Sequence, residues 1–563
     1  MSSTLEPFFI ESDKIKINEC TTMNHMGMQN FTLSSISQLK IFVTSWFLGE
    51  PTYYTSSGDN KKDFAQLNKL KNVNIEEIEK LYLIQKKNHE TTLDLFKKII
   101  TQALDEDFEG VLKLAVEGRN SYNMRSGPVA IIFYAAMHSQ RKIFNAQNPL
   151  KFREYTDQVI KIPTDAWFLF ELYQKTYQNK NKFPTILKKC ISKHLEKIEK
   201  YQMKKYLHKA HLIDLIRITH PRSSKNKIIE EVVKTGDLLV DDNEQTWEKL
   251  RSEKKSWKEI ITILNTLPHM ALLRNLVGIA KDTNDPEYLN NIIVPMLKKG
   301  VKYGKQLPFR YMTCYEEVGK LEDNSCKKIL LDGVSNCIEI AMENFPILEG
   351  KTLCLVDNSG SAHGSFPSQY GVQSIAKIGN LSGVMTAKQC TGKGVVGVFG
   401  DRLVMIDIDK NKNVLDQVNQ IHKEGKEVGR STENGIWVFF KESFEEATNL
   451  KPGTDIELMD RWFDNIMIYS DQQAGCGGLY GSNPKEYSEY VVANKYVNVL
   501  KLIEKYRKLV NPKVNIYSVQ IAGYNNSLVP EILYRTHLLT GWNGNECKYA
   551  YEMNKLMDEL DEI

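Results

Sequence analysis

The sequence changes its periodicity once, near residue 350, and this change constrains the fold more than any other feature. Over 72–344 apolar residues recur at the three- and four-residue spacing of amphipathic helices. Beyond this point short β-rich runs alternate with helical segments, which indicates a doubly wound α/β sheet. A chain of 563 residues is also too long for one core. We therefore predict a multidomain protein, all-α over 1–347 and α/β over 348–563.

Proline residues mark the helix starts in the first half. Pro163 and Thr164 precede one apolar run, and Pro268 precedes another. Amphipathic segments joined by short loops are typical of a degenerate HEAT-like repeat, although no repeat is identical to another. We expect a stack of antiparallel helix pairs.

The second half contains the predicted strands. A helix is expected over 497–509, an insertion or lid over 442–462, and a last helix over 548–563. The predicted strands are 351–356, 395–399, 403–408, 436–440, 466–469 and 514–521.

Composition and the first residues argue against a membrane protein, a secreted protein and a protein held by disulfides or a zinc knuckle. Hydrophobic residues make up 42% and charged residues 26% of the chain, and no window holds the roughly 18 apolar residues that a membrane span requires. No secretory signal is apparent at the start. Nine cysteines without C-x-x-C spacing predict reduced thiols rather than disulfides or a zinc knuckle. We expect a cytoplasmic protein, with a nuclear pool in a eukaryote.

A metal-site motif follows the first predicted strand. Asp357, Ser359 and Ser361 form D-x-S-x-S where the strand ends, and ligands bind at that end of strands in open α/β sheets. One carboxylate and two hydroxyls on alternate residues offer three oxygens to a hard cation. Gly360 allows the turn. The motif predicts Mg²⁺, with Mn²⁺ or Ca²⁺ as alternatives, whereas simple Asx and Ser turns produce similar strings.

Two enzymatic interpretations of nearby residues are weaker. His363 lies close to several serines, but the middle residue of the possible nucleophile elbow at 360–364 is Ala362 rather than serine. The segment 391–394 lacks the spacing of a phosphate loop and precedes a strand instead of a helix. We predict no catalytic residue.

Positive charge is concentrated in one part of a chain whose formal charge is only +4. The stretch 175–227 holds about fifteen Lys and Arg residues against three acids, together with four histidines. Each cation that neutralises a phosphate releases counterions and strengthens binding to nucleic acid. The alternative is a solvated helix face.

Several segments resemble the TROVE module of the Ro autoantigen family, and the resemblance covers nearly the whole chain. The strongest is LPHMALLRNL at 267–276, which resembles the family's M-P-L-T-A-L-L-R-N-L almost residue for residue. The others are GEPTYY at 49–54, GR at 118–119, IPT at 162–164 and DLIRITHP at 214–221. The downstream pattern is similar to a von Willebrand A domain with a metal-ion-dependent adhesion-type site.

The resemblance implies an arrangement and a metal site. In this family HEAT-like helices close into a ring, small Y-type RNAs bind outside it, and single-stranded ends of misfolded RNAs enter the hole. The α/β domain helps to close the ring. The implied metal ligands are Asp357, Ser359, Ser361, Thr432 and Asp471, the last directly or through water. Ser431 is an alternative to Thr432, and a helix N-cap is the alternative role of Asp471.

The basic stretch supplies the candidate RNA contacts. These are Lys188, Lys189, Lys204, Lys205, His208, Arg217, His220 and Arg222. Arg217 lies in an apolar helical string, so a structural role is its alternative, and Arg274 and Asn275 are expected to tie helices together. The family's G-W-S-H segment is replaced here at 209–212, where the histidine is shifted to His211, so a different partner RNA is an alternative to Y-type RNA.

Together these observations predict a non-enzymatic RNA-binding protein. It would serve as a scaffold in RNA quality control, with small non-coding RNA and misfolded RNA as partners and an exoribonuclease or another protein bound through the metal site. The alternatives are a metal-dependent protein-interaction scaffold without RNA and, less favoured, a metal-dependent hydrolase, which usually requires a second metal and more carboxylates.

Overall fold

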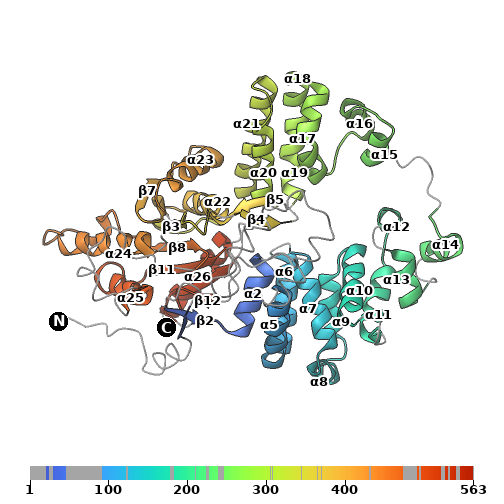
Figure 1. The fold of residues 1–563 in the computed structure, drawn as a ribbon, viewed down its shortest axis with the longest axis horizontal. Helices are drawn as coiled ribbons and strands as arrows, with labels where there is room; N and C mark the ends of the chain where they lie inside the picture. Colours follow the sequence, from blue (N-terminus) through green and yellow to red (C-terminus); the bar gives the residue numbers. More distant parts are fainter. Residues whose placement is uncertain are drawn as a thin grey trace. The chain divides into compact units, whose positions relative to one another are not determined.

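The structure is a computed structural model, and it forms two compact units (Figure 1). One unit contains 34–49 and 92–265, and the other contains 1–33, 50–91 and 266–563. The structure describes residues 21–23, 29–45, 92–121, 124–177, 183–208, 211–222, 227–238, 246–304, 306, 308–343, 345–363, 365–368, 371–429, 433–472, 491–492, 496–521, 526–530, 533–540 and 546–561.

The described part of the unit that contains 92–265 is helical. Its helices are α2 (Ser35–Ser45), α5 (Thr92–Glu106), α6 (Phe108–Asn120), α7 (Ser126–Met137), α8 (Gln140–Gln147), α9 (Lys151–Val159), α10 (Pro163–Tyr177), α11 (Thr185–Leu195), α12 (Lys200–Tyr206), α13 (Leu212–Thr219), α14 (Lys227–Thr235), α15 (Trp247–Ser252) and α16 (Trp257–Leu264). Neighbouring helices pack on each other, since α2 contacts α5, α6 contacts α7 and α9, and α11 contacts α13. A helical first half is confirmed for these residues.

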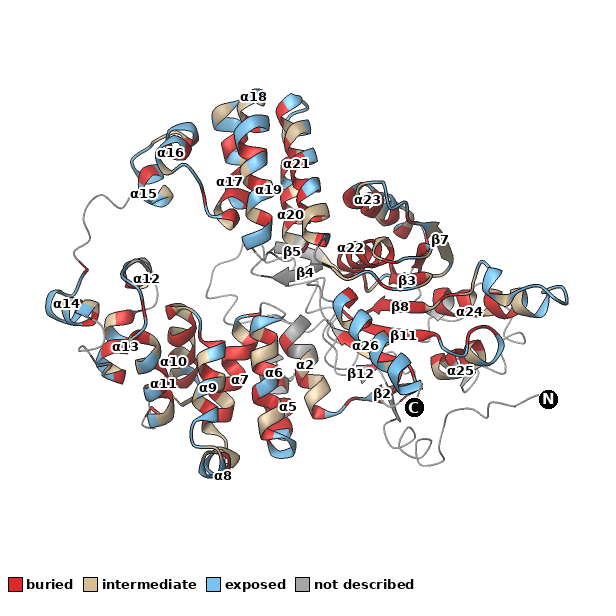
Figure 2. Ribbon diagram, turned by 180° about the vertical axis from the view of Figure 1, so that it is seen from behind, coloured by how far each residue is buried: buried red, intermediate tan, exposed pale blue. Residues whose placement is uncertain are grey.

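Local sequence explains where several of these helices begin and which side they bury. Asp107 caps α6, because its carboxylate accepts a hydrogen bond from the Gly110 amide at 2.8 Å. Ser256 and Glu259 form a reciprocal capping box on α16. Helix α7 is apolar on nearly all sides and is accordingly buried along its length (Figure 2).

The other unit begins its long helical part at α17. Its helices before the sheet are α17 (His269–Thr283), α18 (Pro286–Tyr288), α19 (Val294–Gly304), α20 (Pro308–Gly319) and α21 (Ser325–Met342), with a π-helical turn at Leu289–Ile293 between α18 and α19. Its later helices are α22 (Ile375–Lys388), α23 (Val414–Gly425), α24 (Glu433–Thr448), a 3-10 turn at Ile456–Leu458, α25 (Val499–Leu509) and α26 (Glu546–Asp561).

A six-stranded mixed sheet forms the centre of this unit. Its order is β13 (Thr536–Thr540), β11 (Asn515–Gln520), β8 (Asn465–Ser470), β3 (Thr352–Asp357), β6 (Gly394–Phe399) and β7 (Leu403–Asp407). All neighbours are parallel except β6 and β7. From β3 the chain first builds β6 and β7 on one side and then β8, β11 and β13 on the other. The strand order therefore reverses between β3 and β8, where open α/β sheets bind ligands.

Shorter strand pairs also occur in this unit. They are β1 (Thr21–Met23) with β2 (Gln29–Thr32), β2 with β12 (Asn526–Ser527), β4 (Ser365–Ser368) with β5 (Gly371–Ser374), and β9 (Val491–Val492) with β10 (Tyr496–Val497).

Helices cover both faces of the large sheet. On one face Leu353 and Ile466 join the apolar side chains of α24 and α25 in a buried cluster. On the other face α22 packs against β3, β6 and β8. Both faces of β3 are buried, so its sequence is a continuous apolar run instead of an alternating one (Figure 2). Helices alternating with parallel strands confirm the predicted α/β texture of the second half.

One predicted strand is wrong. Residues 436–440 belong to helix α24, in which Ile436, Phe440 and Phe444 repeat every fourth residue and are buried. A short apolar run flanked by polar residues does not distinguish a strand from a buried helix, and only the continuation to Phe444 shows the helical spacing. The strand β13 was missed, whereas β3, β6, β7, β8 and β11 lie where strands were predicted.

Ion pairs hold the helices before the sheet to the sheet's own helices. Lys388 of α22 donates to Glu339 of α21 at 2.7 Å, and Lys377 of α22 contacts Glu316 of α20 at 2.5 Å. The change from helix to strand falls at the predicted position, but the compact units divide after Asn265. The predicted division into 1–347 and 348–563 remains a prediction about sequence domains.

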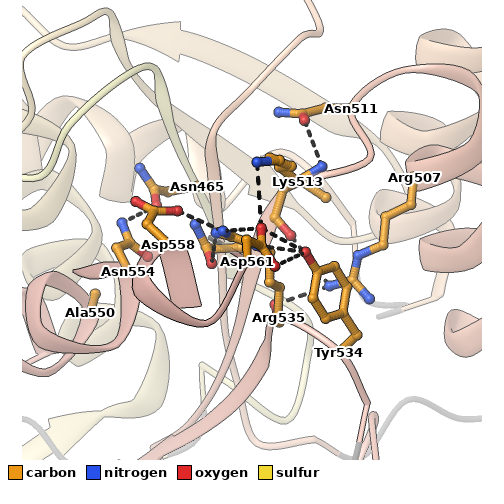
Figure 3. Close-up of polar contacts among 12 residues, drawn as sticks. Asn465, Arg507, Asn511, Lys513, Tyr534, Arg535, Ala550, Asn554, Asp558 and Asp561 are labelled. Carbon is orange, nitrogen blue, oxygen red and sulfur yellow. Dashed lines mark hydrogen bonds and ion pairs between the residues drawn. The ribbon is translucent and has the colours of Figure 1, made fainter. Parts of the chain in front are cut away.

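The C-terminal helix is fastened by a buried arginine (Figure 3). The Arg535 side chain is 1% exposed and donates to Asp558 and Asp561 of α26, the latter at 2.7 Å. Asn554 of α26 also donates to Asn465 of β8 at 2.7 Å. These contacts explain how a mostly polar helix remains attached to the sheet.

Two sequence expectations concern membranes and thiols. Within the described ranges no helix is long and apolar enough to cross a membrane. The described cysteines are buried as free thiols.

Candidate functional site

The loop after β3 places a buried carboxylate at the point where the strand order reverses. Asp357 is 0% exposed. Its Oδ1 accepts a hydrogen bond from the Ser359 amide at 2.9 Å, and its Oδ2 accepts one from the Ser470 hydroxyl at 2.7 Å. The first bond closes an Asx-type turn, and the second joins β3 to β8. The carboxylate is therefore held rigidly from both sides.

Two hydroxyls of the same loop face each other. The Oγ atoms of Ser359 and Ser361 lie 3.2 Å apart, with Ser359 buried and Ser361 partly exposed. Together with Asp357 they form a set of hard oxygen donors, which is the set that Mg²⁺ and Ca²⁺ select. No group of three or more His, Cys, Asp or Glu side chains suited to a metal occurs among the described residues. The donor set fits a hard oxygen-bound cation and does not fit zinc.

The end of β8 contributes the residues beside this loop. Asp471 and Gln472 are fully buried directly after the strand. The Gln472 amide donates to the Ser470 hydroxyl at 3.0 Å, and Gln472 Oε1 accepts from Ser518 of β11 at 2.6 Å. Gln472 also has a positive φ of 61°, an uncommon backbone conformation for this residue type. The site is thus built from three adjacent strands.

Burial determines the electrostatics of Asp357. Desolvation raises the pKa of its carboxyl group, and hydrogen bonds from Ser359 and Ser470 oppose this rise. The ionised carboxylate is accordingly disfavoured in this position unless positive charge compensates it. A bound divalent cation would supply that charge.

Sequence reasoning missed an amide pair that supports the loop. Asn358 Nδ2 donates to Asn380 Oδ1 at 2.9 Å, and Asn380 Nδ2 donates back to Asn358 Oδ1 at 3.1 Å. Both residues are 0% exposed. The pair fixes the D-x-S-x-S loop to α22, and an amide residue among the buried positions of α22 was its sequence signal.

The remaining residues near the loop are placed as follows. His363 is partly buried, and its Nε2 lies 3.1 Å from the carbonyl oxygen of Gly425. Ser470 was also missed, although it directly precedes Asp471 at the end of a predicted strand. Thr432 and its alternative Ser431 lie outside the described residues, so their role as ligands remains a prediction.

The candidate RNA-binding residues lie on successive helices of the unit that contains 92–265. Lys189 on α11, Lys204 on α12 and Arg217 on α13 are exposed, and Lys188 is partly exposed. His208, His220 and Arg222 are exposed in the segments that follow α12 and α13. The side chain of Lys205 lies outside the described part. Helix α13 buries Leu212, Leu215, Ile216 and Thr219, and Arg217 lies on its exposed side. This position does not favour the alternative of a structural role for Arg217 in the helical core.

Part of the positive charge of this stretch is neutralised by acids that lie before it in the sequence. Asp157 of α9 pairs with Lys193 at 2.5 Å and with Lys197 at 3.4 Å, and Glu171 pairs with Lys175 at 2.8 Å. Lys188, Lys189 and Lys204 have no ion-pair partner among the side chains that the structure describes. The surface available to a polyanion is therefore smaller than the sequence count indicates.

The fold and the site define a class of protein with a large helical part and a mixed α/β sheet whose polar loops meet at the strand-order reversal. Among solved structures, the chain is similar to the crystal structure of the Deinococcus radiodurans RO (RSR) protein. The TM-score is 0.52 at 11% identity, and the match covers 93% of this chain and 100% of that chain. This likeness shows a Ro-like fold. No protein-family model matches the sequence, and no curated protein sequence matches it significantly.

Proposed function

We propose that this chain is an RNA-binding scaffold of the Ro type that takes part in quality control of non-coding RNA without catalysing a reaction. The observation that carries the proposal is the structural likeness to the RO (RSR) protein over 93% of the chain. Exposed cations on α11, α12 and α13 support it, because they suit a phosphate backbone. Two ligand classes are proposed, small Y-like RNA and the single-stranded ends of misfolded RNA.

The proposed architecture has two parts. The helices would form a TROVE-type ring of HEAT-like repeats, and the sheet would be a von Willebrand A-like domain. The order β13-β11-β8-β3-β6-β7, with β7 antiparallel at the edge, supports the second assignment. The loop containing Asp357, Ser359 and Ser361 would then hold Mg²⁺, with Mn²⁺ or Ca²⁺ as alternatives, and Thr432 and Asp471 would complete the site. Localisation in the cytoplasm is part of the same proposal.

A binding experiment tests the RNA part. The purified chain is titrated at one salt concentration with a labelled hairpin that has a free 3′ tail and with the same hairpin whose 3′ end is base-paired. We expect both to bind and the tailed RNA to bind more tightly. Equal affinities would reject the proposed capture of single-stranded ends, and absence of binding to either RNA would reject the function.

A second candidate function is a protein-interaction scaffold that uses the metal site. The buried Asp357 carboxylate, held between Ser359 and Ser470, favours it, because such a rigid site can present a cation with an open position to a partner's carboxylate. The two functions occupy different compact units and are compatible, with an exoribonuclease among the candidate partners. RNA binding that disappears in chelator while the protein stays folded would contradict this division of roles. Hydrolysis is less favoured, since it usually employs a second metal and a cluster of carboxylates, and no such cluster occurs among the described residues.

A further inference from the structure

A series of three rings leads from the core of the helical unit to its surface. Phe170 on α10 is buried, and its ring centroid lies 5.5 Å from that of Trp167 on the same helix. The partly exposed Trp167 in turn stacks on His211, with centroids 4.3 Å apart and an interplanar angle of 24°. The His211 side chain is 54% exposed. The outermost ring of an anchored stack thus presents a surface to solvent.

Helix capping does not explain the position of the His211 ring. His211 occupies the N-cap position of α13, but its side chain makes no capping hydrogen bond. Its backbone is left-handed, with φ at 43°, a conformation that histidine adopts more readily than most residues. The residue therefore uses an uncommon backbone conformation while its ring lies on Trp167.

Cations lie close to this stack along the chain. The His211 amide donates to the carbonyl oxygen of His208 at 3.3 Å, so the two histidines share one turn. Lys204 precedes His208 by four residues on α12, and α12 packs against α10, which carries Trp167. Both Lys204 and His208 are exposed. The exposed ring of His211 and the exposed side chains of Lys204 and His208 are therefore close in sequence, and the helices α10 and α12 pack on each other.

The charge beside His211 favours a base over a phosphate as its ligand. Asp214 Oδ2 lies 3.8 Å from His211 Nδ1 and is itself well exposed. A carboxylate at this position repels a phosphate, whereas it does not oppose the face of an uncharged base. Stacking also requires no sequence preference, because every base has a π-face.

We propose that Trp167 and His211 form a stacking platform for one base of a single-stranded RNA, with Lys204 and His208 holding the adjacent phosphates. This inference rests on the proposed RNA-binding function and adds to it a named base-binding subsite. The stacked base would extend the series of rings by one member. Trp167 fixes the orientation of His211, and His211 contacts the base.

An abasic oligonucleotide separates base contacts from phosphate contacts. The wild-type protein and His211→Asn are titrated with a short single-stranded oligoribonucleotide and with its abasic analogue of equal length and charge. Asparagine also tolerates the left-handed backbone but has no ring. We expect the wild type to prefer the base-bearing strand and His211→Asn to reduce that preference by about fivefold or more. Affinity for the abasic strand should change little.

Lys204→Gln is the matched control, because it removes a nearby charge and leaves the rings in place. It should weaken binding of both strands alike and leave the base preference unchanged. Equal weakening of both strands by His211→Asn would overturn the platform and make His211 a phosphate contact. An unchanged preference with a lowered melting temperature would also overturn it, since the stack would then serve packing only. If the wild type binds neither strand, the proposed function fails and the platform with it.

Discussion

The guanidinium of Arg119 donates a 2.9 Å hydrogen bond to Asp165, whose side chain is 2% exposed. Arg119 comes from α6 and Asp165 from the first turn of α10. The bond therefore joins the GR segment at 118–119 to the residue that follows the IPT segment at 162–164, and both segments resemble the TROVE module. Asp165 also accepts from the backbone amides of Lys161 and Ile162. The pair thus fixes the start of α10.

Removing Arg119 should destabilise the helical unit strongly. Arg119→Met leaves the buried Asp165 carboxylate without its most buried cation, and we expect a loss of about 3 kcal/mol. Arg125→Met is the control, because the Arg125 side chain is 50% exposed and contacts the same carboxylate, and we expect less than about 1 kcal/mol. Denaturant unfolding of both variants measures the difference. Equal losses in the free energy of unfolding would show that burial does not determine how much each ion pair contributes to stability.

Arg535 should control the attachment of the C-terminal helix. Arg535→Met removes the cation between Asp558 and Asp561 and should destabilise α26 by about 3 kcal/mol, because the arginine is almost fully buried (Figure 3). Hydrogen exchange should then become faster in 546–561 before it does so in β3 and β6. Uniform acceleration across the sheet would instead indicate that α26 and the sheet unfold as one unit. Lys513→Met, which removes a more exposed contact to Asp561, is the control.

Divalent cation should stabilise the wild type through Asp357. Mg²⁺ at about its Kd adds only about 0.4 kcal/mol, and a hundredfold excess adds about 2.7 kcal/mol. Asp357→Asn should abolish this gain while the fold and the RNA affinity remain. Thermal unfolding with Mg²⁺, with Mn²⁺ and in chelator measures the effect. Asp407→Asn is the control, since Asp407 ends the antiparallel strand β7 at the other edge of the sheet and is exposed. An equal Mg²⁺ effect in Asp357→Asn would disprove the site.

The lysines selected as RNA contacts should dominate the salt dependence of RNA binding. Replacing Lys188, Lys189, Lys204 and Lys205 by Glu should weaken binding, and each Lys→Ala change at a phosphate contact should reduce the slope of log affinity against log salt by about 0.7 for single strands. Lys193→Ala and Lys197→Ala are the controls, because Asp157 already pairs with both. Similar slopes for both sets would mean that the basic surface is only solvated.

Stability should fall on acidification because the folded state disfavours the charged form of His194, a partly exposed residue whose Nε2 atom is buried. Desolvation lowers the pKa of His194 from 6.5 to about 4. Between these values the unfolded state binds the proton and the folded state does not. The free energy of unfolding is therefore highest above pH 6.5 and decreases as pH falls towards 4, by up to about 1.4 kcal/mol per pH unit. His194→Gln should flatten this dependence, measured by denaturant unfolding at several pH values. An unchanged slope would assign it to other groups, such as His537, whose pKa burial also lowers to about 4.

Features determined by neighbouring residues could be predicted from the sequence. The strands β3, β6, β8 and β11 could be predicted from their apolar runs, because a strand buried on both faces needs a continuous apolar segment. The loop at Asp357 could also be located, since its oxygens are only two residues apart. Even locally the prediction failed at 436–440, where helix and strand have the same short apolar pattern.

Features that join distant residues were decided by the tertiary structure alone. Ser470 holds Asp357 across 113 positions, and Asp157 neutralises lysines about forty positions away on another helix. The stack of His211 on Trp167 likewise depends on how α10 and α13 pack. A charge count or a motif contains no information on such partners, because hydrogen bonds, ion pairs and ring contacts require a separation of a few ångströms that only packing creates.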